Sequence, residues 1–183
     1  MKYLSFIVLI TLFTSCGSNV TTQDPPPLKV SDAEMESDFS KCPNGTIPAI
    51  FDIDTSAQKL IASQKFVPAK GSVTETVTFA SGVELTLEQS GCKVLKQRYS
   101  FRFPKTPKEE NPNFWIALAI AQFDYMSKVN QQFGGLRNLM ATEAEGMKLG
   151  QPLQGEDYSL IIDKFPEGEE TILVVSFDLI YSY

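Results

Sequence analysis

Apolar and polar residues alternate through the middle of the chain with the period of two that is typical of half-buried β-strands. Three apolar residues alternate with three threonines between Val73 and Phe79, and the same spacing recurs between Val83 and Leu87. When the apolar faces are matched, Phe79 lies opposite Val83 and Ala80-Ser81-Gly82 forms the turn. Its glycine supplies the positive φ that such a turn needs, so this stretch predicts a β-hairpin.

A further strand is predicted after the turn signal Ser90-Gly91, which sets Leu87 opposite Val94. The aromatic residues at alternate positions from Tyr99 onward must share the face of Val94. Because their spacing from Val94 is odd, we expect a one-residue bulge near Leu95. The three strands then form a β-meander.

The new strand carries the basic residues Lys96, Arg98 and Arg102 on one face. In the predicted register, Lys96 lies beside Thr86 and Arg98 lies beside Glu84. A basic stripe of this kind is a candidate anion site or partner-binding surface. Pairing with the glutamates of the preceding strand is the alternative, and it requires no ligand.

Asn111-Pro112 predicts a helix start, because asparagine caps a helix and proline at the first position gives up no needed N–H. We expect this helix to end near Phe133, before Gly134-Gly135, and a second helix to cover residues 136–147. One face of the first helix is apolar apart from one glutamine, and its members are Trp115, Leu118, Ala119, Gln122, Tyr125, Met126 and Val129. Its first half is apolar on nearly all sides, which indicates either a core helix or a contact surface around Phe114 and Trp115.

Two closing strands are predicted at residues 158–165 and 171–183, joined through Pro166-Glu167-Gly168. The last strand is apolar on both faces, so we expect it to be central and covered from both sides. An earlier strand is expected at residues 47–53. This order predicts an α+β fold: an antiparallel sheet built from a β-meander, one or two helices packed on one face, and a C-terminal β-hairpin.

The N-terminal residues follow a different pattern, with one lysine, a short apolar run and then small residues. That is the layout of a secretory signal peptide at residues 1–15, and the run is too short to span a bilayer. Phe13-Thr14-Ser15-Cys16 resembles a bacterial lipobox, with Phe13 a loose match at its first position. The resemblance implies lipid attachment at Cys16 in the cell envelope, and Gly17 favours the outer membrane, facing the periplasm. Residues 16–40 are then a lipidated tether and residues 41–183 a single globular domain.

Charge and cysteine content narrow the class of partner. The 183 residues carry a formal net charge of −6, which suits neither nucleic acid nor anionic headgroups. The acidity fits a cationic partner, or solubility alone.

Once Cys16 carries lipid, Cys42 and Cys92 remain, and in an oxidising compartment we predict that they form a disulfide. Free thiols or a metal site are the alternatives, but two cysteines without any histidine make a poor zinc site.

Side chains for catalysis are scarce. The chain contains no histidine, which excludes Ser-His-Asp and Cys-His nucleophilic systems and histidine-containing zinc sites. Asp52 and Asp54 would share one face of a strand, but no further ligand follows for a metal. Ser56 and Lys59 match an S-x-x-K spacing without the other elements of that enzyme class. We therefore expect no enzyme, no metal and no cofactor.

The sequence favours a non-catalytic, lipid-anchored envelope protein whose domain binds another envelope protein, with Phe114 and Trp115 as candidate contacts. An inhibitor or immunity protein against a cationic cell-wall hydrolase is a narrower alternative. A carrier of a small apolar ligand is a third, with a pocket lined by Phe101, Phe103 and Phe177.

Overall fold

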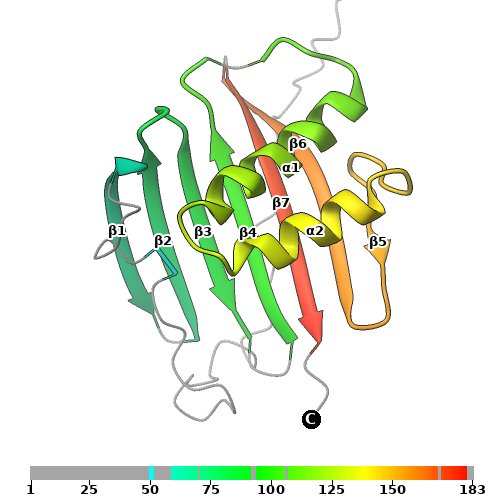
Figure 1. The fold of residues 1–183 in the computed structure, drawn as a ribbon, viewed down its shortest axis with the longest axis horizontal. Coiled ribbons are helices and arrows are strands. Elements are labelled where there is room, and N and C mark those ends of the chain that lie inside the picture. The colour runs from blue at the N-terminus through cyan, green and yellow to red at the C-terminus, as the bar shows by residue number, and fades with distance from the viewer. Residues whose placement is uncertain are drawn as a thin grey trace, which may run out of the picture.

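The computed structural model describes residues 50–51, 59–69, 71–91, 94–105, 107–168 and 170–180. In chain order its elements are β1 (Ile61–Ala69), β2 (Ser72–Phe79), β3 (Glu84–Ser90), β4 (Val94–Arg102), α1 (Pro112–Ser127), α2 (Phe133–Glu143), β5 (Leu153–Gln154), β6 (Tyr158–Glu167) and β7 (Glu170–Ile180). Within these residues the strands form one antiparallel sheet in the order β1-β2-β3-β4-β7-β6-β5. Both helices lie over the same face of this sheet (Figure 1), so the protein has an α+β fold with a C-terminal hairpin.

The β2–β3 hairpin has the register that the alternating pattern predicts. Thr78 pairs with Glu84, and the N–H of Phe79 donates to the carbonyl of Val83 at 2.9 Å. Gly82 adopts a φ of 82°, the left-handed conformation that the turn requires. The three-residue turn and its glycine are therefore confirmed.

The β3–β4 register differs from the predicted one by four residues. Arg98 pairs with Glu88 rather than Glu84, and Lys96 pairs with Ser90 rather than Thr86. The pairing runs without interruption, so the expected bulge is absent from the part of this ladder that the structure describes. The prediction was wrong because it assumed a tight turn at Ser90-Gly91, whereas the connection is longer. A shift of four residues leaves the side chains from Lys96 onward on their predicted faces, whereas Val94, without the bulge, lies on the face opposite to that of Tyr99.

A buried pair of glutamines favours the observed register. Gln97 donates from Nε2 to Oε1 of Gln89 at 2.8 Å, and both side chains are buried on the helix-covered face. A hydrogen bond between two buried amides is lost if the strands slip. The alternating pattern contains no signal for this contact, because it sorts residues by polarity and ignores their partners.

The helix start was predicted correctly and the helix end was not. Asn111 caps α1, accepting a hydrogen bond on Oδ1 from the N–H of Asn113 at 3.0 Å. The helix ends at Ser127, and Gly134-Gly135 lie inside the first turn of α2 instead of ending α1. The side-chain oxygen of Asn130 accepts from the N–H of Gln132 at 3.0 Å. Such a local bond competes with helix continuation.

The face that α1 buries is rotated from the predicted one. The buried residues are Trp115, Ile116, Ala119, Phe123 and Met126, whereas Gln122 is only half-buried. Because the start of the helix is apolar on nearly all sides, periodicity alone does not fix its orientation.

Phe123 is the centre of an aromatic core between the helices and the sheet. Its ring lies 4.8 Å from that of Tyr99, 5.7 Å from Phe177 and 6.1 Å from Phe101, distances typical of favourable edge-to-face contacts. Phe101 and Phe177 are fully buried, and Phe103 is 8% exposed. Phe123 therefore occupies the space beside Phe101 and Phe177 where a carrier would hold an apolar ligand.

Strand β7 is central, as predicted, since it pairs with β4 on one side and β6 on the other. Its inward residues, Leu173, Val175 and Phe177, are fully buried. The expectation of cover on both faces is not met among the described residues, because both helices lie on one face (Figure 1). On the other face Ile180 is 49% exposed.

The strand expected at residues 47–53 falls mostly outside the described residues, and its two described members, Ile50 and Phe51, lie in a bend. Cys16, Cys42 and Cys92 also lie outside them. Among the helices that the structure describes, none has the length and apolar character needed to cross a bilayer.

Candidate functional site

The start of α1, the loop before it and strand β6 meet around the indole of Trp115. This side chain is 1% exposed, and its Nε1–H donates to the carbonyl of Glu109 at 2.8 Å. Lys164 of β6 lies over the same indole, with Nζ 5.2 Å from the ring centroid. Its Nζ also lies 3.4 Å from that Glu109 carbonyl. The buried tryptophan therefore fixes the loop, the helix and the strand relative to one another.

Phe114 has the opposite environment, although it is the neighbour of Trp115 in sequence. Consecutive helical residues are about 100° apart around the axis, so burial of one directs the other outward. Phe114 is 36% exposed, and its ring meets that of Trp115 edge-on, with centroids 5.6 Å apart. Of the two candidate contacts, Phe114 is at the surface and Trp115 belongs to the core.

A pocket of about 270 Å³ opens beside Trp115. Trp115 and Lys164 line it from the helix and the sheet, and Lys108, Glu109 and Glu110 line it from the loop. Pockets for drug-sized ligands start at about 300 Å³, so this one is suited to a single protruding side chain. Its charged groups carry both signs, which fits a polar or amphipathic side chain better than a purely apolar one.

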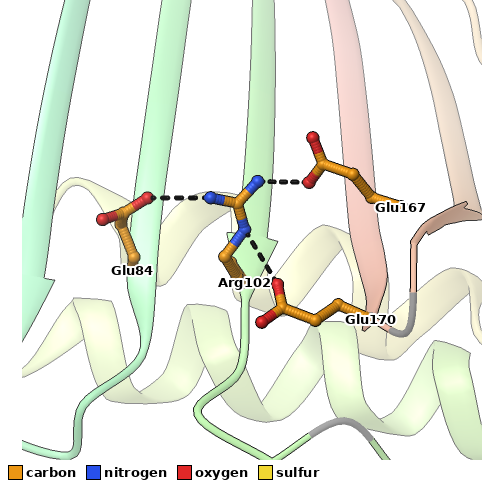
Figure 2. A network of polar contacts seen from close by, with 4 residues as sticks. All are labelled: Glu84, Arg102, Glu167 and Glu170. Carbon is orange, nitrogen blue, oxygen red and sulfur yellow. Dashed lines mark hydrogen bonds and ion pairs between the residues drawn. The ribbon is translucent and has the colours of Figure 1, made fainter.

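Arg102 lies on the other face of the sheet and is surrounded by three glutamates (Figure 2). Its guanidinium pairs with Glu167, with Glu170 at 3.2 Å and with Glu84 at 3.8 Å. The hydrogen bond and the charge of Glu167 raise the pKa of Arg102 above its usual value. The network joins β3, β4 and the β6–β7 hairpin, and its acids neutralise Arg102 without any ligand.

Lys96 and Arg98 share that open face and also have polar neighbours across the ladder. Lys96 lies between Ser90 and Asp178, and Arg98 lies opposite Glu88. The basic stripe is therefore interleaved with acids from the adjoining strands. It also lies on the face opposite the helices, so the five candidate contact residues do not converge on one site.

The sequence analysis missed Glu75, the one acidic side chain that is buried among the residues the structure describes. It is 0% exposed and points to the helix-covered face, between Val73 and Val77. An acid at an inward position of an alternating strand is the sequence signal that would have found it. Its partners are backbone N–H groups of Ile50 and Phe51.

Metal-ligating side chains do not cluster in the described part of the chain: no group of three or more His, Cys, Asp or Glu residues is arranged to hold an ion there. No protein-family model matches the chain, and the chain matches no curated protein and no solved structure. Its function is therefore inferred from its own residues.

Proposed function

We propose that this chain is a non-catalytic, lipid-anchored protein of the bacterial cell envelope whose domain binds another envelope protein. The anchor is supported by the signal-like residues 1–15 and by the lipobox-like Phe13-Thr14-Ser15-Cys16. In this proposal Cys16 holds the domain at the outer membrane, on its periplasmic side. The domain then meets its partner at the start of α1.

The observation that supports the contact surface is the pairing of an exposed aromatic ring with a buried one. Phe114 is 36% exposed and rests against Trp115, which is 1% exposed and hydrogen-bonded. A ring that already packs against a buried neighbour loses little conformational freedom when a partner covers it. Aromatic residues are enriched at protein–protein interfaces and among the residues that dominate interface energies.

Site-specific photocrosslinking in the native host tests this surface. A crosslinking residue in place of Phe114 is compared with one in place of Val67, which is 44% exposed on β1. We expect one discrete adduct from position 114, lost when Lys164→Glu alters the adjoining pocket, and none from position 67. The same adducts from both positions would contradict the proposal. So would an adduct from position 114 whose yield is unchanged by Lys164→Glu.

The anchor is tested separately by Cys16→Ala. We expect this substitution to abolish incorporation of labelled fatty acid and to release the protein from the membrane fraction. Ser18→Ala, two residues further along, is the matched control and should change neither. Membrane association that survives Cys16→Ala would rule out lipid attachment at this cysteine.

Inhibition of a cationic cell-wall hydrolase is an alternative function, in which the open face of the sheet, and not the start of α1, contacts the partner. It is supported by the excess of acid in Figure 2, where Glu84, Glu167 and Glu170 surround a single guanidinium. Such a complex would associate faster at low ionic strength. We expect a hydrolase inhibitor to slow lysis of purified peptidoglycan by lysozyme, and to lose potency in Glu167→Gln/Glu170→Gln. Unchanged lysis would remove lysozyme-like hydrolases as targets.

A further inference from the structure

Ile50 and Phe51 are held against the domain in the way that a bound peptide is held. The two carboxylate oxygens of Glu75 accept hydrogen bonds from their backbone N–H groups, at 2.9 Å for Ile50 and 3.0 Å for Phe51. Asn130, between α1 and α2, donates from Nδ2 to the carbonyl of Ile50 at 2.8 Å. Among the described residues, side chains thus satisfy both N–H groups and the Ile50 carbonyl of this segment.

The side chain of Phe51 completes the contact. It is fully buried, stacked on Phe133 at 5.1 Å and edge-on to Phe79 at 6.0 Å. Phe133 begins α2 and Phe79 ends β2. The ring therefore fills a groove between the helix layer and the first half of the sheet.

The carboxylate of Glu75 makes this groove a binding site for N–H donors. Its carboxylate is fully buried, and among the described residues its bonds come from two backbone amides and from the side-chain amide of Gln64. No lysine or arginine of the described residues pairs with it. A buried carboxylate without such donors is strongly destabilised, so whatever occupies the groove must supply consecutive N–H groups.

We propose that Ile50–Phe51 is a strap docked in a peptide-binding groove, and that the strap opens separately from the rest of the domain. The groove then accepts an extended peptide that presents two consecutive backbone N–H groups and an aromatic side chain. Its walls are Glu75, Phe79, Asn130 and Phe133.

Native-state hydrogen exchange of the purified full chain tests the separate opening. We expect the amides of Ile50 and Phe51 to exchange at least about tenfold faster than those of Val175 and Phe177 in central β7, with a weaker dependence on denaturant, as local openings show. Glu75→Ala should then speed the strap amides by a further factor of roughly 10 to 100, the loss expected for charge-assisted hydrogen bonds. Equal rates and equal denaturant dependence in strap and β7 would overturn the proposal.

A peptide added in trans tests the groove itself. Phe51→Ala weakens the strap and leaves Glu75 in place, and a synthetic peptide with the sequence of residues 46–56 is the probe. We expect the peptide to raise the melting temperature of Phe51→Ala in a saturable way, and to have no effect on Phe51→Ala/Glu75→Leu. The same peptide with alanine at the position of Phe51 is the matched control.

No rise at millimolar peptide would show that the groove takes only its own strap and would overturn the binding part of the proposal. If the alanine variant fails to fold alone, refolding in the presence of the probe peptide but not of its control gives the same answer. Neither measurement involves a membrane or an envelope partner, so failure of the proposed function leaves both readouts intact.

Discussion

The two faces of the sheet treat the same chemical group in opposite ways. On the helix-covered face, the carboxylate of Glu75 is fully buried and bound by three N–H donors. On the open face, the carboxylates of Glu84, Glu167 and Glu170 are each 43% to 55% exposed around Arg102. Burial decides how much each carboxylate interaction contributes to stability. An exposed charge that loses its ion-pair partner is solvated by water instead, so the loss costs little free energy. A buried group has no such replacement.

The largest effect expected on the covered side comes from Trp115→Ala. Emptying a buried aromatic site removes packing and leaves a cavity, which costs about 3 to 5 kcal/mol of unfolding free energy. Phe114→Ala is the matched control at the surface and should cost less than about 1 kcal/mol. Chemical denaturation of both variants measures the difference. Similar losses from the two substitutions would contradict the assignment of one ring to the core and one to the surface.

Glu75→Leu tests the polar group on the same face. The substitution introduces an apolar side chain of similar size and leaves the N–H groups of Ile50 and Phe51 without their acceptors, so we expect a loss of about 2 to 4 kcal/mol. Glu75→Gln keeps one acceptor oxygen and should cost about half as much. Equilibrium unfolding in urea checks both values. Stabilisation by Glu75→Leu would mean that these hydrogen bonds do not compensate for burial of the carboxylate.

The opposite expectation applies to Arg102→Met, on the open face. Despite three acidic neighbours, the guanidinium is 42% exposed, and we expect a loss of no more than about 1 kcal/mol. Glu84→Gln, which removes the longest of its ion pairs, should be neutral to within about 0.5 kcal/mol. If Arg102→Met lowered the unfolding free energy nearly as much as Glu75→Leu does, the two faces would not differ in the way described.

The same contrast explains which parts of the fold the sequence could predict. Alternation assigned the residues of β2 and β3 to their faces and set the β2–β3 register, because Gly82 marks the turn by its conformation. It misplaced the β3–β4 register by four residues, since contacts such as Gln89–Gln97 are made between side chains far apart in sequence. The predicted end of α1 was wrong for a related reason: the side chain of Asn130 accepts a local hydrogen bond from the N–H of Gln132, and hydrophobic periodicity contains no signal for such a bond.

The candidate site was predicted only in part. Phe114 and Trp115 were identified as a pair, but which ring faces solvent depends on the rotation of α1, and that rotation is fixed by the core around Phe123. Glu75 was detectable as an acid at an inward position. Its partners were not, because Ile50 and Phe51 reach it through a bend that no periodic pattern marks.

Salt gives the smallest and most selective test of the two faces. At about 1 M ionic strength the Debye length falls to about 3 Å, so exposed charges are screened and buried ones much less so. The difference in unfolding free energy between the wild type and Arg102→Met should then shrink by a few tenths of a kcal/mol. The difference between the wild type and Glu75→Leu should stay constant, because the carboxylate is fully buried and its hydrogen bond with Phe51 is buried with it. Urea titrations of the three proteins at low and high NaCl separate the two outcomes, since the general effect of salt on hydrophobic burial cancels in each difference. A Glu75 difference that fell with salt would place that carboxylate within reach of solvent and make it the same kind of site as Arg102.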